Sequence, residues 1–136
     1  MIYDLENFNE SSLDINCDIC ISGAGAAGIT LAIKLSEYGF KVILCEAGSE
    51  DYTDISQKNY TGKINGDPYF DLDVARLRYL GGTTNHWNGM CRPFEKVDFK
   101  RKYLGEQFIW PIEYEEILKY QNEACKILEI TNNFIK

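Results

Sequence analysis

The chain has 136 residues, of which 45% are hydrophobic and 13% aromatic. This composition excludes a disordered chain, and the length suits one domain rather than two. The net charge of −7, from 21 acidic and 14 basic residues, argues against a nucleic-acid-binding protein, because phosphate neutralisation requires a basic face. No apolar run reaches the ~18 residues that a spanning helix needs, so no transmembrane segment is predicted.

The first 16 residues are polar and acidic. They lack the positively charged start and the apolar core of a secretion signal. We therefore expect residues 1–16 to form a short flexible arm, residues 17–136 to carry the folded part, and the protein to be cytoplasmic.

The five cysteines are consistent with reduced thiols in a cytoplasmic protein, because no secretion signal precedes them. Cys17 and Cys20 form a C-x-x-C pair, a spacing also used for zinc or redox chemistry. The pair lies in an apolar run that is typical of a strand, and the chain has one histidine and no second ligand pair. We therefore expect small buried apolar side chains here and no metal site.

A strand, a helix and a second strand follow one another near the N-terminus. Residues 15–22 end in an apolar stretch that predicts a buried strand. A glycine-rich turn over 23–28 leads into an apolar helix over 29–38, which Gly39 ends as a C-terminal cap. Residues 41–45 predict a second buried strand. The sequence thus predicts an α/β fold with a Rossmann-like βαβ unit, parallel strands and a right-handed crossover.

The rest of the chain is less regular. Residues 49–73 and 76–93 show no helical or strand period, and long irregular stretches of this kind are usually functional. Residues 113–130 predict one amphipathic helix. Its apolar face comprises Tyr114, Ile117, Leu118, Cys125 and Leu128.

The glycine-rich turn has the Gly-x-Gly-x-x-Gly spacing of a dinucleotide-binding motif. Gly23 permits the tight turn, Gly25 leaves room for a pyrophosphate, and Gly28 allows close packing of helix and strand. Glu46 ends the second strand, where an acid accepts hydrogen bonds from an adenosine ribose and disfavours the 2′-phosphate of NADP. The alternative is a tight turn in a ligand-free α/β domain, with Glu46 as a surface charge. The long irregular region after Glu46 favours FAD over NAD.

The segment Arg78-Tyr79-Leu80-Gly81-Gly82-Thr83-Thr84-Asn85-His86-Trp87-Asn88-Gly89 resembles the second cofactor-contacting segment of the glucose–methanol–choline (GMC) oxidoreductases. Its Gly-Gly-Thr-Thr-Asn-His-Trp form is most similar to the branch of pyranose oxidase and fructose dehydrogenase. Arg92-Pro93, Asp98-Phe99 and Trp110-Pro111-Ile112 resemble the same branch in order and spacing.

The resemblance implies an incomplete FAD-binding domain over 17–136 and assigns three groups of residues to the cofactor. The ADP half would be held by Gly23, Gly25, Ala26, Ala27, Gly28 and Glu46. The pyrophosphate and ribityl chain would lie along Arg78, Gly82, Thr83 and Thr84. The isoalloxazine ring would be approached by Asn85, His86, Asn88 and Gly89. His86 lies where some members carry a covalent flavin link, and both the covalent and the non-covalent interpretation stay open.

The reaction that the resemblance implies is hydride transfer from a CH–OH group of an alcohol or sugar to the flavin N5. A histidine near the C-terminus of the family removes the hydroxyl proton. The only histidine here is His86, so no catalytic residue is assigned. We expect the N-terminal fragment of a longer enzyme, inactive without its remainder. Two alternatives remain: a truncated non-catalytic nucleotide-binding protein, and another FAD- or NAD-dependent enzyme that shares only the βαβ motif.

Overall fold

The computed structural model describes residues 1–8, 12–100 and 109–132. It is a mixed α/β structure that divides into two compact units, unit 1 over Met1–Asn88 and unit 2 over Gly89–Lys136. Each unit is described by itself.

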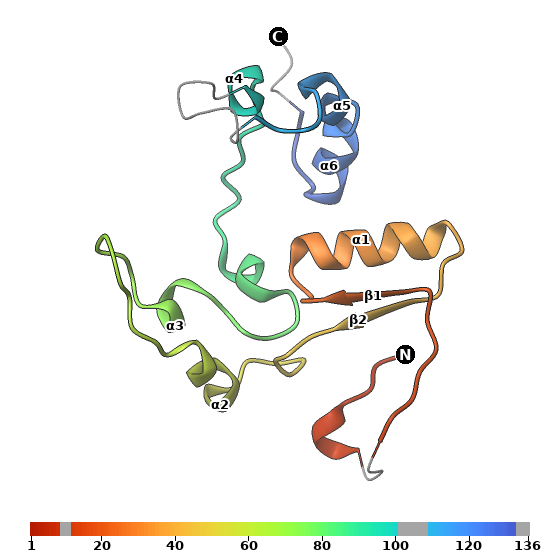
Figure 1. Cartoon of the computed structure of the whole chain (residues 1–136), viewed down its shortest axis with the longest axis vertical. Helices are drawn as coiled ribbons and strands as arrows, with labels where there is room; N and C mark the ends of the chain where they lie inside the picture. The colour runs from red at the N-terminus through yellow and green to blue at the C-terminus, as the bar shows by residue number, and fades with distance from the viewer. Residues whose placement is uncertain (9–11, 101–108, 133–136) are drawn as a thin grey trace. The chain divides into compact units, whose positions relative to one another are not determined.

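The centre of unit 1 is a two-stranded parallel sheet with one helix along it (Figure 1). Strand β1 (Ile19–Ser22) pairs with β2 (Val42–Cys45) in parallel. Helix α1 (Ala26–Glu37) connects them. Gly39 follows its C-cap residue Tyr38, and the φ of +89° at Gly39 is the left-handed conformation expected of a glycine at this place. The predicted strand–helix–strand order and the parallel pairing are confirmed, and the arrangement is compatible with part of a Rossmann-like unit.

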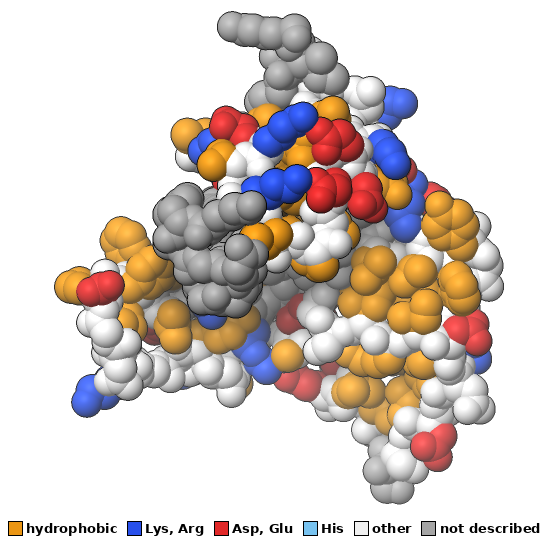
Figure 2. All heavy atoms as spheres, turned by 45° about the horizontal axis from the view of Figure 1, so that its top comes forward, with side chains coloured by type: hydrophobic (Ala, Val, Ile, Leu, Met, Phe, Trp, Pro, Cys, Tyr) orange, Lys and Arg blue, Asp and Glu red, His pale blue; other side chains and the backbone are white. Residues whose placement is uncertain are grey.

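The predicted burial of both strands is wrong for the part of the chain that the structure describes, because α1 covers only one face of the sheet. Leu44 faces α1, since its Cδ1 lies 3.5 Å from the position that a Cβ on Gly28 would take. Cys20 and Cys45 are exposed. Leu31 and Ile33 on α1 are also half exposed, and Figure 2 shows hydrophobic side chains gathered on this part of the surface.

The prediction that residues 49–73 lack regular structure is also wrong. They contain α2 (Asp54–Gln57), the 3-10 turn η2 (Lys58–Tyr60) and the start of α3 (Leu72–Ala75). Thr53 caps α2, because its hydroxyl accepts a hydrogen bond from the Ser56 N–H at 3.2 Å. Two further 3-10 turns are η1 (Leu5–Asn7), in the predicted arm, and η3 (Gly82–His86).

Unit 2 contains α4 (Lys96–Phe99), α5 (Tyr114–Leu118) and α6 (Gln121–Ile127). The single helix predicted over 113–130 is therefore two helices. The Tyr120 N–H bonds to the Ile117 carbonyl three residues earlier, at 3.0 Å, and this tighter step interrupts the α-helical pattern. Of the apolar face predicted for that helix, Cys125 is buried while Leu118 and Leu128 are exposed.

Phe99 is the centre of the apolar core of unit 2, at 2% exposure. Its ring lies 5.6 Å from that of Phe94, 5.7 Å from that of Trp110 and 5.9 Å from that of Tyr114. Such spacings are typical of aromatic pairs in protein cores. The aromatic cluster thus holds α4 against the start of α5.

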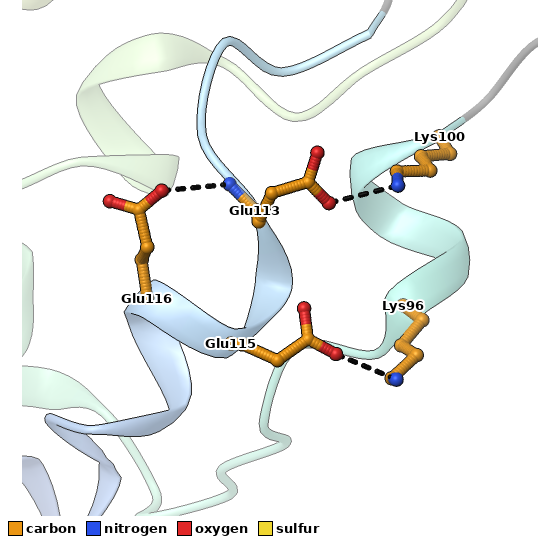
Figure 3. A network of polar contacts seen from close by, with 5 residues as sticks. All are labelled: Lys96, Lys100, Glu113, Glu115 and Glu116. Carbon is orange, nitrogen blue, oxygen red and sulfur yellow. Dashed lines mark hydrogen bonds and ion pairs between the residues drawn. The ribbon is translucent and has the colours of Figure 1, made fainter.

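Two ion pairs join the same helices on the surface (Figure 3). The Lys96 Nζ lies 2.6 Å from Glu115 Oε1, and the Lys100 Nζ lies 2.8 Å from Glu113 Oε2. Glu113 and Glu116 also form the capping box that begins α5. Among the described residues, no helix is long and apolar enough to cross a membrane.

Candidate functional site

The glycine-rich turn joins β1 to α1 and leaves an open space beside its middle glycine. Gly23 has a φ of +97°, and its N–H donates to the Cys45 carbonyl at 2.7 Å. A Cβ on Gly28 would stand 2.0 Å from the Gly23 carbonyl oxygen, so a side chain is excluded there. A Cβ on Gly25 would meet nothing within 4 Å. The backbone therefore leaves no room for a side chain at Gly28. The space beside Gly25 is empty, and the phosphates of a ligand could approach there.

The N-terminus of α1 opens from the same turn. Gly25 is the N-cap residue, and the first helical residues are Ala26, Ala27 and Gly28. The first N–H groups of a helix have no acceptor within the helix, and together with the helix dipole they favour an anion. The first turn of α1 contains no acidic residue whose negative charge would repel an anion. This end of α1 therefore has the chemistry of a phosphate site.

Glu46 follows β2 and lies beside the turn. Its Oε2 accepts a hydrogen bond from the Ala24 N–H at 2.8 Å, and its Oε1 accepts from the N–H groups of Ala47 and Gly48, both at 2.9 Å. A carboxylate has about four lone-pair positions. Three are used here, so the carboxylate holds the turn in place and retains one position for a ligand hydroxyl.

The Gly81–Gly82 pair lies directly against the glycine-rich turn over residues 23–28. The Gly81 N–H donates to the Ala24 carbonyl at 2.8 Å, and Gly25 and Gly81 form a bridge of the parallel type. A Cβ on Gly82 would lie 3.6 Å from the Gly25 Cα. The structure thus brings together two segments that are more than fifty positions apart in the sequence and that the sequence singled out separately.

The polar side chains after Gly82 bind backbone groups nearby. Thr83 Oγ1 accepts from the Leu77 N–H at 3.1 Å, Thr84 Oγ1 donates to the Gly81 carbonyl, and Asn85 Nδ2 donates to the Leu80 carbonyl at 2.8 Å. These contacts fix the shape of η3. The side chains that the resemblance assigned to a ligand therefore also stabilise the loop that carries them.

Four other predicted site residues lie as follows. Arg78 is half-buried, and its guanidinium donates to the Ser56 hydroxyl at 3.0 Å. His86 is exposed at the last position of η3. Asn88 is the last residue of unit 1, whereas Gly89 is the first of unit 2.

Two buried polar residues that the sequence did not single out hold the second segment in place. Ser56 and Gln57 on α2 are 7% and 5% exposed. Gln57 Nε2 donates to the carbonyls of Asp73 and Arg76, both at 2.6 Å, while its Oε1 accepts from the Arg78 N–H at 3.1 Å. The only signal in the sequence is Thr53, a helix-capping residue type placed three positions before Ser56.

Gly48 is a further residue that the sequence analysis did not assign to the site. A Cβ there would lie 2.1 Å from the Arg78 carbonyl oxygen and 2.7 Å from the Tyr79 Cα. The backbone after Glu46 therefore packs directly on the backbone that leads to Gly81.

The site as a whole offers hydrogen-bond donors, a helix N-terminus and one carboxylate. Within the described ranges, no group of three or more His, Cys, Asp or Glu side chains could hold a metal ion. These features can bind the phosphates and a ribose of a nucleotide, and the glycine cradle at Gly25 fits the ADP half of FAD. The redox chemistry would come from the bound group.

Comparison with known proteins gives relatives whose matches cover part of this chain and a smaller part of each relative. The chain is 26% identical to 2-methyl-1,2-propanediol dehydrogenase of Mycolicibacterium austroafricanum, over 84% of this chain and 24% of that protein. It is 36% identical to an oxygen-dependent choline dehydrogenase of Pseudomonas putida, over 54% of this chain and 16% of that protein. It is 46% identical to a putative Rieske 2Fe-2S iron-sulfur protein of Bacillus subtilis, over 56% of this chain and 16% of that protein. No family model and no solved structure matches.

The chain thus spans about a quarter or less of the length of these curated relatives. Two of them are dehydrogenases by name, so the chain is similar to oxidoreductases, as the sequence predicted. A Rieske centre takes two histidines and two cysteines as ligands. This chain has one histidine and cannot supply that ligand set by itself.

Proposed function

We propose that this chain is the N-terminal, FAD-binding portion of a flavin-dependent oxidoreductase that acts on CH–OH groups of an alcohol or sugar. The observation that carries the proposal is the hydrogen bond from the Gly81 N–H to the Ala24 carbonyl. It joins the Gly-x-Gly-x-x-Gly turn to the Gly-Gly segment, so both cofactor-contacting segments of the GMC resemblance form one surface.

In this proposal the chain's own residues bind and orient the cofactor. The N-terminus of α1 and the open side of Gly25 receive the pyrophosphate, and the free position on the Glu46 carboxylate receives a ribose hydroxyl. Gly82 lies beside Gly25 and continues the same surface. Bound FAD would supply the hydride acceptor, while the proton acceptor would come from outside this chain.

Two of the relatives favour an alcohol as the substrate. Both dehydrogenase names contain an alcohol, a diol in one case and choline in the other. The match to the diol dehydrogenase covers 84% of this chain, which is more than the β1–α1–β2 unit alone. That extent supports the GMC interpretation over an enzyme that shares only the βαβ motif. The pyranose oxidase branch rests on the Gly-Gly-Thr-Thr-Asn-His-Trp segment and on the order and spacing of the motifs over residues 92–112, not on the relatives.

A titration of FAD into the full chain, followed by flavin fluorescence, tests the proposal. The variant Gly25→Val places a side chain in the open space beside the turn and is expected to weaken FAD binding by roughly a hundredfold or more, because it blocks the approach of the pyrophosphate. Gly62→Val is the matched control, since a Cβ at Gly62 meets its nearest atom at 3.9 Å and the residue lies away from the turn.

Several outcomes of this titration are informative. Competition by ADP and little competition by NADP would agree with the carboxylate of Glu46 at the ribose. Equal FAD affinity in the Gly25→Val variant, or no FAD binding by the parent chain, would contradict the proposal. If denaturation leaves flavin attached and mass spectrometry places it on His86, the covalent interpretation is correct, and complete release supports the non-covalent one.

A further inference from the structure

Cys20 and Cys45 form a pair of thiols on the exposed face of the sheet. Their Sγ atoms lie 3.8 Å apart, within hydrogen-bond distance for sulfur, although the residues are 25 positions apart in the sequence. Cys20 lies on β1, Cys45 lies at the end of β2, and both are exposed. In this chain by itself, reagents in solution can therefore reach both sulfur atoms.

The thiol pair lies next to the glycine-rich turn. The carbonyl of Cys45 accepts the hydrogen bond from the Gly23 N–H at 2.7 Å. The next residue, Glu46, accepts the hydrogen bond from the Ala24 N–H at 2.8 Å. A displacement of Cys45 would thus act directly on the two hydrogen bonds that hold the turn against the end of β2.

The two sulfur atoms have different roles in a reaction with a disulfide reagent. The hydrogen bond with Cys20 is the largest cause that raises the pKa of Cys45, and burial raises it further. A raised pKa disfavours the thiolate form of Cys45. Because the thiolate is the attacking species, we assign the first attack to Cys20.

We propose that Cys20 and Cys45 form a reversible disulfide that loosens the glycine-rich turn. The oxidant is a low-molecular-weight disulfide such as oxidised glutathione. The Cys20 thiolate attacks one sulfur of the reagent, which breaks its S–S bond and releases one glutathione thiolate. Cys45 then loses its proton and attacks the mixed disulfide at Cys20, which releases the second glutathione. Two protein thiols are oxidised and one glutathione disulfide is reduced to two thiols.

The strand register makes this disulfide easy to reduce. Cys20 lies opposite Ile43, and Cys45 lies opposite Ser22, so the two cysteines are diagonal neighbours. Neighbouring strands lie about 4.8 Å apart and two residues rise about 6.6 Å along a strand, so the Cα atoms at these diagonal positions lie roughly 8 Å apart. Unstrained disulfides join Cα atoms up to about 6.8 Å apart. Closure must therefore shift the end of β2. Strained and exposed disulfides have higher reduction potentials, as expected of a reversible one.

Cys17, the other member of the C-x-x-C pair, is a less suitable partner for Cys20. It precedes β1 and is half-buried. The described side chains offer no metal cluster here. The C-x-x-C spacing could not indicate the pair of Cys20 and Cys45, because β2 brings Cys45 beside Cys20 from 25 positions away.

The proposal is tested on the full chain, equilibrated in mixtures of reduced and oxidised glutathione and then digested without reduction. Mass spectrometry is expected to find one peptide pair joined through Cys20 and Cys45, with the loss of two hydrogen atoms and reversal by dithiothreitol. Cys20→Ser and Cys45→Ser abolish the link, whereas Cys17→Ser retains it. A Cys17–Cys20 link, or glutathione that remains attached at Cys20 without resolution by Cys45, would overturn the proposal.

A second measurement addresses the turn and does not depend on nucleotide binding. Amide hydrogen exchange at Gly23 and Ala24 is expected to be roughly tenfold faster in the oxidised chain, because both N–H groups lose acceptors near Cys45. The Cys45→Ser variant, treated with the same reagent, should show no change. Equal exchange rates in the oxidised and reduced parent chains would overturn the proposed loosening, even if the disulfide forms.

Discussion

At the scale of single residues, Gly28 is a position where the backbone leaves no room for a side chain. A Cβ would overlap the Gly23 carbonyl oxygen at 2.0 Å, and the backbone would have to shift. Gly28→Ala is therefore expected to lower the free energy of unfolding by about 1–3 kcal/mol, the usual cost of overpacking. Urea unfolding followed by circular dichroism measures this loss.

Gly25→Ala is the matched control, three positions earlier in the same turn. Its φ of −82° suits any residue, and a Cβ there meets nothing within 4 Å. The free energy of unfolding should change by no more than about 1 kcal/mol, because two small effects oppose each other. Glycine is the better N-cap residue, which favours the parent chain, whereas alanine lowers the entropy of the unfolded chain, which favours the variant. If both variants unfold at the same urea concentration, the steric argument for Gly28 is wrong.

At the scale of secondary-structure elements, the contact between α4 and α5 should depend on pH. The hydrogen bond with Lys96 is the main cause that lowers the pKa of Glu115, while the hydrogen bonds with Glu115 and Glu113 raise the pKa values of Lys96 and Lys100. A lowered carboxyl pKa gives stability that is lost as the pH falls through it. A raised lysine pKa gives stability that is lost as the pH rises through it.

The ion pairs of unit 2 are therefore expected to stabilise it between roughly pH 4 and pH 10 and to weaken outside that window. Lys96→Met should flatten the acid side of the stability profile, with Lys119→Met as the control. The effect should be small, because both side chains of the ion pair are more than half exposed. We expect 1 M salt to remove it, because the ions then screen the attraction between the two charges within about 3 Å. An unchanged acid profile in Lys96→Met would show that the pair contributes nothing.

The sequence predicted the β1–α1–β2 unit because its period and its glycines are local signals. Helices α2 and α3 have four residues each, which is about one turn and too short to display a helical period. The contacts of Gln57 join residues 16 to 21 positions away, and the Gly81–Ala24 bond spans a still longer separation. Such pairings depend on the path of the chain between them, which no local pattern specifies.

At the scale of the whole molecule, the described residues bury little apolar surface. The buried hydrophobic residues among them are Ala24, Phe99 and Cys125. In unit 1, a shallow groove between α1 and β2 is lined by Ala32, Ile33, Val42 and Leu44, together with two polar residues of α1. Exposed apolar patches of this kind bind other apolar surfaces or molecules.

An apolar fluorescent dye should therefore bind the folded chain in this groove, and Ile33→Glu should reduce its fluorescence by about half or more, because a charge replaces apolar surface. Ile33 is 53% exposed, so the fold should tolerate the change with an unfolding free energy within about 0.5–1 kcal/mol of the parent. Ile55→Glu is the matched control, since Ile55 is 81% exposed on α2, away from the groove. Equal dye fluorescence in the parent chain and both variants would place the apolar binding surface elsewhere. An equal fall of the fluorescence in both variants would show that the dye responds to net charge rather than to the groove.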